Sequence, residues 1–162
     1  MKTLIVYYTW HNGNTQRIAE MIQKGTAGDL CRIETVIPYP ENYRKASDQA
    51  KKETETGYEP EIQPVPYDIN DYDQIVIGTP TWWYTMAPAV RTYLHSQNWE
   101  GKTVIPFMTN AGWPGTVIQD MTELCSGAVI RHPMEVKFDS DGGNILETDP
   151  ETLQKWIAEL SE

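Results

Sequence analysis

Three clusters of polar, glycine and aromatic residues could bind a phosphorylated ligand, and the first lies near the amino terminus. An apolar segment, residues 3–8, leads directly into Thr9, Trp10, His11, Asn12, Gly13, Asn14 and Thr15. A helical pattern follows at once. Because this turn lacks Lys and Arg, it would hold an anion through helix N-terminal N–H groups and through Thr and Asn side chains. The same residues also cap ordinary helices, so an ordinary strand-to-helix turn stays open as the alternative.

The two other clusters each follow an apolar run and contain tryptophan. One consists of Pro80, Thr81, Trp82, Trp83 and Tyr84, and the other contains Thr109, Asn110, Gly112 and Trp113. Large rings at loop tips are costly to expose, so they either pack on the core or bind a flat partner. A planar aromatic ligand with a phosphate tail would satisfy these loops and the anion-binding turn at once. The structural alternative is that Trp82 and Trp83 merely cover the edge of the domain.

Apolar runs that alternate with helical patterns predict the elements that position these clusters. Strands are expected at 3–8, 32–37, 75–77 and 104–108, and a fifth at 128–130 together with 134–138. Helices are expected from Asn14, at 43–56, from Pro88, at 117–125, and after a capping box of Thr148 and Glu151. This alternation predicts one α/β domain over residues 1–162, a doubly wound parallel sheet that binds ligands beyond the carboxyl ends of its strands.

Composition and charge exclude several classes of partner. The 162 residues carry a formal net charge of -10, whereas nucleic acid or an anionic membrane would require a basic face. Cys31 and Cys125 form no CxxC pair and are expected to be reduced thiols. No apolar stretch approaches a membrane span and no signal peptide is visible, so we expect no membrane insertion and a cytoplasmic location. The three histidines are too scattered to predict a metal site.

At these residues the chain resembles the flavodoxin family. Residues 9–15 look like the loop that binds the FMN phosphate, although the loop is one residue longer than the common pattern and Asn12 stands where Thr is usual. Residues 77–82 look like the second flavin loop, in which a tryptophan stacks on the isoalloxazine, and residues 107–112 fall where the third loop should. Residues 39–43 are similar to a segment of bacterial flavodoxin-like proteins. The resemblance implies a five-stranded parallel sheet in the order 2-1-3-4-5 with helices on both faces.

The resemblance also implies noncovalently bound FMN and assigns residues to its parts. The phosphate would be surrounded by Thr9, Asn12, Gly13, Asn14 and Thr15 of the first loop, and Trp10 of the same loop is also expected to bind the cofactor. The isoalloxazine or ribityl chain would meet Pro80, Thr81, Trp82 and Trp83, with Trp82 as the stacking ring. Trp83 and Tyr84 would each either shield the flavin or face a partner. Backbone groups of Thr109, Asn110 and Gly112 would meet the pyrimidine edge, and Trp113 would cover the other flavin face.

The resemblance favours an electron carrier, in which the protein supplies no acid, base or nucleophile. Its acidic surface would attract a reductase and an acceptor that carry basic docking faces. One alternative is an NAD(P)H-dependent FMN or quinone reductase on the same fold, which usually needs a basic residue for the nucleotide phosphate. The proposed loops contain no Lys or Arg. The other alternative is an interaction module on the same fold that has lost its flavin.

Overall fold

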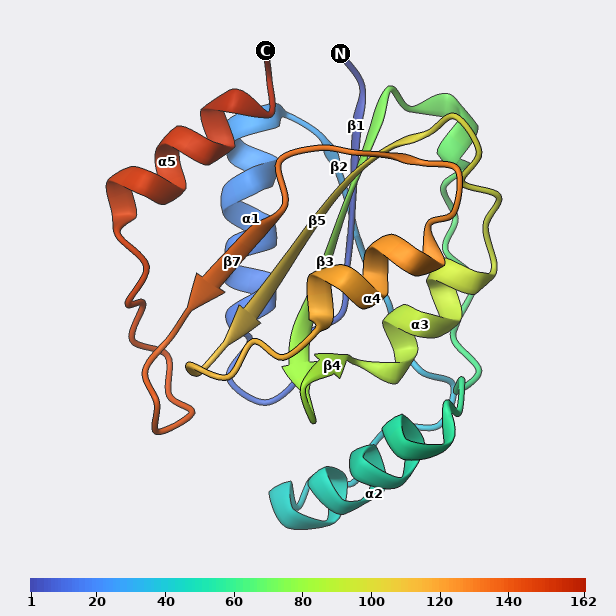
Figure 1. The fold of residues 1–162 in the computed structure, drawn as a ribbon, viewed down its shortest axis with the longest axis vertical. Helices are drawn as coiled ribbons and strands as arrows, with labels where there is room; N and C mark the ends of the chain where they lie inside the picture. The colour runs from blue at the N-terminus through green and yellow to red at the C-terminus, as the bar shows by residue number, and fades with distance from the viewer.

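A single twisted sheet forms the centre of the protein, whose computed structural model describes residues 1–162 (Figure 1). Its strands are β1 (Thr3–Tyr7), β2 (Asp29–Arg32), β3 (Gln74–Trp82), β4 (Thr85–Met86), β5 (Thr103–Asn110), β6 (Val129–Ile130) and β7 (Met134–Lys137). The hydrogen-bonded path runs β2-β1-β3-β5-β6, and β7 also pairs with β5. Every pairing is parallel except that of β4 with β3. The predicted doubly wound parallel sheet is therefore confirmed.

The strand order agrees with the expected order once two local features are counted. The short β4 is an added hairpin partner of β3, so β5 takes the fourth place. The fifth place is divided: β6 pairs with Thr103 and Val104, and β7 pairs with residues 107–110 of the same strand.

The position expected for the second strand was wrong. That strand was expected at 32–37, but β2 ends at Arg32, opposite Tyr7, the last residue of β1. Beyond this point β1 offers no partner, and Thr35 instead bridges to Ile62.

All five expected helices are present. They are α1 (Asn14–Thr26), α2 (Tyr43–Thr56), α3 (Pro88–His95), α4 (Val117–Leu124) and α5 (Pro150–Glu159), and a short 3-10 turn covers Ile69–Asp71. The expected capping box of α5 was wrong. Asp149 caps this helix by accepting from the Glu151 N–H, whereas the Thr148 hydroxyl accepts from the Lys137 N–H.

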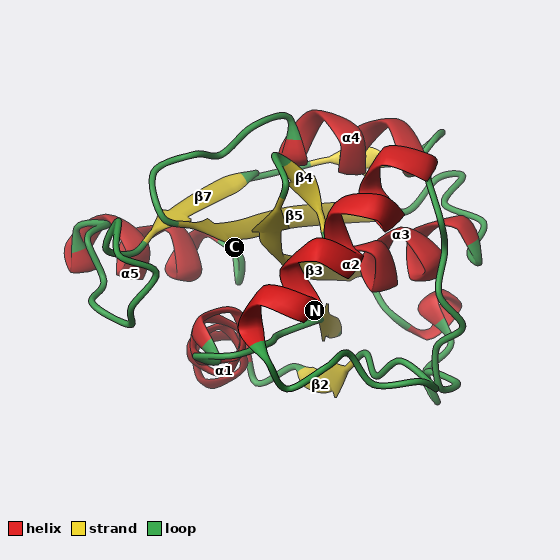
Figure 2. Cartoon of the chain, turned by 90° about the horizontal axis from the view of Figure 1, so that it is seen from below, coloured by secondary structure: helices red, strands yellow, loops and turns green.

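Two helices cover each face of the sheet, which explains the nearly continuous apolar strands. On β1, Ile5 and Tyr7 belong to the core beneath α1 and α5, whereas Leu4 and Val6 belong to the core beneath α3 and α4. Figure 2 shows these helices on the two sides of the strands. The carboxyl ends of β1, β3 and β5 thus reach one edge together, at the bottom of Figure 1.

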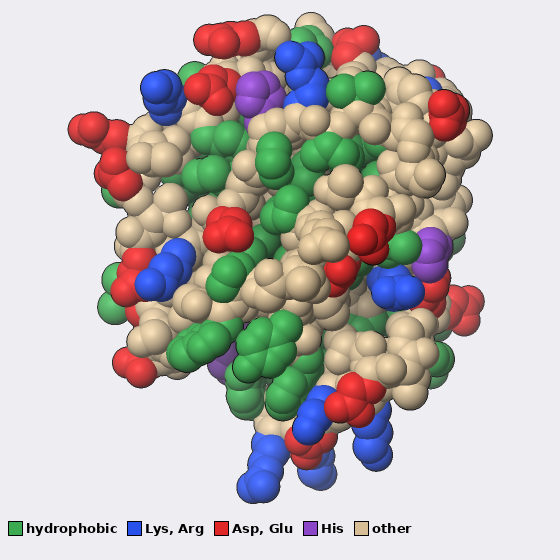
Figure 3. All heavy atoms as spheres, in the orientation of Figure 1, with side chains coloured by type: hydrophobic (Ala, Val, Ile, Leu, Met, Phe, Trp, Pro, Cys, Tyr) green, Lys and Arg blue, Asp and Glu red, His purple; other side chains and the backbone are tan.

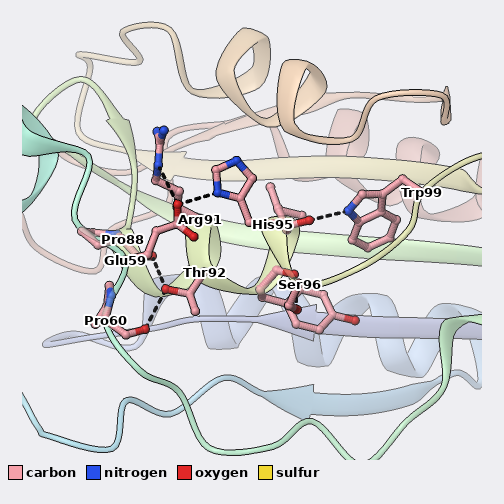
Figure 4. A network of polar contacts seen from close by, with 10 residues as sticks. Glu59, Pro60, Pro88, Arg91, Thr92, His95, Ser96 and Trp99 are labelled. Carbon is pink, nitrogen blue, oxygen red and sulfur yellow. Dashed lines mark hydrogen bonds and ion pairs between the residues drawn. The ribbon is translucent and has the colours of Figure 1, made fainter.

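Helix α2 is the exception, because it projects from that lower edge instead of lying flat on the sheet (Figure 1). The segment that follows it is held to α3. There the Glu59 carboxylate meets His95 and lies 3.7 Å from Arg91 Nε, and the Thr92 hydroxyl donates to the Pro60 carbonyl at 2.7 Å (Figure 4). Partly exposed ion pairs of this kind contribute about 1 kcal/mol or less each, so their main effect is to fix the path of the segment after α2.

Gly78 in β3 provides a test of the packing that supports this edge. A Cβ at this buried position would lie 2.2 Å from Cζ of Phe107, whose side chain is fully buried. We expect Gly78→Ala to lower the free energy of unfolding by about 1–3 kcal/mol, measured by urea denaturation. Because Leu removes the clashing ring, Gly78→Ala combined with Phe107→Leu should lose less stability than the two single variants added together. Wild-type stability of Gly78→Ala would contradict the packing.

Candidate functional site

Hydroxyl groups join the loop after β1 to the end of β5. The hydroxyls of Thr15 and Thr109 lie 2.8 Å apart, and both side chains are buried. Thr9, also buried, accepts from the Gln16 N–H at 3.4 Å. Buried polar groups need partners, so these contacts fix the path of the loop as it turns into α1.

The first turn of α1 is left open for an acceptor. Gly13 forms the N-cap with a φ of 71° and has no side chain to cap the helix, and of the first three N–H groups only that of Gln16 is taken, by the Thr9 hydroxyl. A left-handed conformation suits glycine, and the first N–H groups of a helix have no partner within the helix. The helix dipole adds partial positive charge at the same point. The turn can therefore hold an anion without any Lys or Arg.

A loop after β7 forms the outer wall beside this turn. The Asn12 amide donates to the Gly142 carbonyl, and the Asn14 amide donates to the Gly143 carbonyl at 2.9 Å. Asp139 shapes the loop by accepting from the N–H groups of Gly143 and Ile145, at 3.1 and 2.9 Å. The sequence gives no sign of this contact, because it joins residues about 130 positions apart.

Trp82 stands within a cluster of tyrosine and tryptophan rings. Its ring centroid lies 5.6 Å from Tyr8, 6.0 Å from Trp10 and 5.1 Å from Tyr39, and each of these rings is nearly perpendicular to it. Edge-to-face contacts of this kind stabilise an aromatic pair by about 0.5–1.5 kcal/mol beyond area burial. Three such contacts hold the indole in one orientation.

The same cluster connects to α2 through a buried hydrogen bond. The Tyr39 hydroxyl donates to Glu53 Oε1 at 2.6 Å, and Gln49 donates to the other carboxylate oxygen at 2.8 Å. Burial raises the pKa of Tyr8 and of Tyr39, and the bond to Glu53 raises that of Tyr39 further. Both hydroxyls therefore stay protonated at neutral pH, and Tyr39 acts as a fixed donor to the helix.

The turn between β3 and β4 holds two aromatic residues in left-handed conformation. Trp83 has a φ of 51° and Tyr84 a φ of 69°, a conformation that costs about 1–2 kcal/mol for a residue other than glycine. The Thr116 N–H donates to the Tyr84 carbonyl at 2.9 Å, and a Cβ on Gly115 would lie 2.1 Å from that oxygen. Contacts with the loop after β5 therefore fix this strained turn, and such strain gathers at functional sites.

Two adjoining cavities lie at this edge. A polar cavity of about 140 Å³ reaches from the start of α1 to the end of β5, and an aromatic cavity of about 270 Å³ lies between α2 and the end of β3. Trp10, Tyr43 and Trp82 line both cavities. Neither cavity is lined by Lys or Arg. The Asp139 carboxylate also lines the polar cavity, and the N–H groups of Gly143 and Ile145 hold its two oxygens. The start of α1, at the polar end, suits an anion that is bound by neutral donors, and the aromatic end suits a flat ring.

Most of the residues singled out in the sequence lie around these cavities. The polar cavity is lined by Trp10, Asn12, Asn14, Thr15, Pro80, Trp82, Thr109 and Asn110, and Trp83 lines the aromatic one. Six lie outside both linings, namely Thr9, Gly13, Thr81, Tyr84, Gly112 and Trp113. Of these, Thr81 donates to the Thr109 carbonyl at 2.9 Å and joins the ends of β3 and β5. Tyr84 and Trp113 are exposed at the surface.

Sequence reasoning missed other lining residues, above all those of α2. Ala46, Ser47 and Ala50 line the aromatic cavity, and Ala111, Asp139, Gly142 and Gly143 line the polar one. No group of three or more His, Cys, Asp and Glu side chains could hold a metal ion. None of the helices combines the length and the apolar character that a bilayer crossing requires.

Comparison with known proteins adds to this geometry. The family model described as flavodoxin matches residues 2–158. A flavoprotein from Lactobacillus acidophilus, crystallised in complex with FMN, is 29% identical, with a TM-score of 0.73 over 83% of this chain and 91% of that one. No curated protein matches the sequence.

Two more distant structures share the fold. A flavodoxin, WrbA-like protein from Agrobacterium tumefaciens is 17% identical, with a TM-score of 0.65 over 99% of this chain and 92% of that one. Oxidised flavodoxin 1 from Bacillus cereus is 16% identical, with a TM-score of 0.59 over 97% and 92% of the two chains.

The bond between Tyr39 and Glu53 provides a test of how α2 is held. Tyr39→Phe leaves one oxygen of a buried carboxylate without its donor, so we expect a loss of about 1–3 kcal/mol in the free energy of unfolding, measured by chemical denaturation. Tyr58→Phe, at an exposed tyrosine, is the matched control and should change little. Adding Glu53→Gln to Tyr39→Phe should cost less than the two single changes together, since the buried charge is gone. Equal stability of Tyr39→Phe and Tyr58→Phe would show that the bond does not hold α2.

Proposed function

The chain belongs to the flavodoxin family, and we propose that it binds FMN noncovalently and carries electrons between protein partners. The observation that carries this proposal is the pair of adjoining cavities, one polar and one aromatic, which share Trp10, Tyr43 and Trp82. A phosphorylated flavin has a polar anionic end and a flat apolar end in the same order. The related flavoprotein from Lactobacillus acidophilus, crystallised with FMN, supports the choice of cofactor.

The phosphate would bind at the start of α1. The donors at the polar cavity or beside it are the N–H groups of Asn14 and Thr15, the Thr15 hydroxyl where Thr109 donates to it, and the second amide hydrogens of Asn12 and Asn14, whose first ones go to Gly142 and Gly143. Hydrogen bonds to a charged acceptor stabilise it by about 1.5–3 kcal/mol each, so a few such donors suffice without a cation. Thr9 would not contact the phosphate directly but would support the loop by accepting from the Gln16 N–H.

The ring system would lie against Trp82. Trp10 and Tyr39 already hold this indole by its edges, so little freedom is lost when a second ring stacks on it. Around it we assign Pro80, Thr81, Trp83 and Tyr84 to the ring or ribityl chain, Thr109, Asn110 and Gly112 to the pyrimidine edge, and Trp113 to the outer flavin face. FMN supplies the electron transfer when bound, and the protein binds, orients and shields it.

The absence of Lys and Arg from both cavity linings favours the carrier over a reductase, because a pyridine nucleotide needs a cation for its phosphate. One observation supports the reductase as a second candidate. Lys51 Nζ lies 5.2 Å from the ring of Trp83, at the rim of the aromatic cavity. An interaction module without flavin is the remaining alternative, and failure to take up FMN would support it.

Partners and location follow from charge and from the cysteines. A net charge of -10 supports partners with basic docking faces, which long-range attraction would draw to the acidic surface. Both cysteines are free thiols, which supports a reducing compartment such as the cytoplasm.

The visible spectrum separates the three candidate functions. We expect the purified protein to shift the absorption bands of added FMN, and NADPH supplied without oxygen to leave the bound flavin oxidised until a separate reductase is added. Prompt bleaching by NADPH alone would establish a reductase and contradict the carrier. Unshifted flavin bands would show that the protein does not bind FMN and that it shares only the fold of its relatives.

Trp82 provides the sharpest test of where the ring lies. We expect Trp82→Ala to weaken FMN binding by about 1–3 kcal/mol, through lost stacking and lost burial, in a fluorescence titration. Tyr58→Ala removes an exposed ring that lines neither cavity and serves as the control. An FMN dissociation constant unchanged in Trp82→Ala would move the stacking role to another ring.

A further inference from the structure

Helix α2 carries a concentration of positive charge on an acidic protein. Of the 13 Lys and Arg residues, α2 contributes Arg44, Lys45, Lys51 and Lys52, all with exposed side chains. Its exposed carboxylates are only Asp48 and Glu55, because Glu53 is buried against Tyr39. None of the four cations takes part in an ion pair. Their charge is therefore available to an outside partner.

This charge lies beside the proposed cofactor site. Ser47 of α2 lines the aromatic cavity and accepts from Trp83 Nε1 at 2.9 Å, and Lys51 Nζ lies over the Trp83 ring at 5.2 Å. Arg44 is seven residues before Lys51, so the two side chains lie on the same side of the helix. In Figure 3 the cationic side chains gather at the lower end of the molecule, directly below a group of apolar ones.

The same end also exposes aromatic rings. Tyr43 is 62% exposed, Trp83 41%, Tyr84 60% and Trp113 58%. Exposed apolar surface next to a specific cavity marks an interaction site, and protein interfaces are enriched in Tyr, Trp and Arg. The composition of this end is therefore more typical of an interface with another protein than of a surface that stays exposed to water.

We propose that α2 and the exposed rings of Tyr43, Trp83 and Tyr84 form the docking surface for an acidic face of the electron-transfer partner. This inference rests on the proposed function, because it places the partner at the edge of the cofactor. On the other side of the polar cavity lie Asp139, which lines it, and the exposed Asp141. The basic face proposed from net charge would meet these carboxylates, so charges of two signs fix the orientation of the partner.

The local charge is tested first without any flavin. Trp99 and Trp156 are buried, so ionic quenchers reach mainly the rings at this end of the FMN-free protein. We expect iodide to quench tryptophan fluorescence at least about twofold more strongly than caesium, each quenching constant being divided by that of the same ion with free N-acetyltryptophanamide, despite the net charge of -10. Arg44→Glu with Lys51→Glu should reverse this preference. Lys24→Glu with Lys155→Glu, an equal charge change on α1 and α5, should preserve it.

Stronger quenching of the wild type by caesium would overturn the inference, because net charge would then govern this end. Loss of the iodide preference in the control variant as well would do the same. Since no flavin is present, this outcome is independent of whether FMN binds.

Docking is tested on the FMN-loaded protein, reduced with dithionite. Hexacyanoferrate(III), an anion, stands for an acidic partner and hexaammineruthenium(III) for a basic one, and each complex gains one electron. We expect the hexacyanoferrate(III) rate to fall with added salt and to drop at least about threefold in the Arg44→Glu with Lys51→Glu variant, but not in the control. A rate that rises with salt in a protein that binds FMN would overturn the docking surface alone. Failure to bind FMN would instead overturn the proposed function.

Discussion

Parallel pairing of β1, β3 and β5 is the constraint on which the site depends. Parallel strands end at the same edge, so the loops after residues 7, 82 and 110 must meet although they are far apart in the sequence. The hydroxyl contact of Thr15 with Thr109 and the hydrogen bond from Thr81 to the Thr109 carbonyl join these loops directly. The uncapped start of α1 and the indole of Trp82 therefore lie next to each other at this edge.

Helix α2 gives this edge its particular character. Tyr39 and Gln49 donate to the buried carboxylate of Glu53, and Ala46 and Ala50 of the same helix line the aromatic cavity. The cations of the helix stay exposed, and Lys51 lies over the Trp83 ring at the rim of the same cavity. Net charge governs how the protein attracts other proteins at long range. The cations of α2 instead set the local electrostatic potential at the proposed docking surface.

The sequence predicted those parts of the fold whose signals are local. Apolar strands at β1, β3 and β5 and the turns that follow them stand out, because burial on both faces demands continuous apolar runs. The end of β2 could not be read, since it depends on where β1 stops. The lining by α2 could not be predicted either, because small residues such as Ala46 and Ala50 give no sign of the cavity that they line. Likewise, nothing near Gly142 and Gly143 indicates that their carbonyls meet Asn12 and Asn14.

The most direct test of an anion site at the start of α1 is to compare the dissociation constants of FMN and riboflavin. The two ligands differ only in the phosphate. Two hydrogen bonds to a charged acceptor contribute about 3 kcal/mol or more, so riboflavin should bind at least about a hundredfold more weakly. Equal dissociation constants would contradict phosphate binding at this turn, and with it the assignment of the polar cavity.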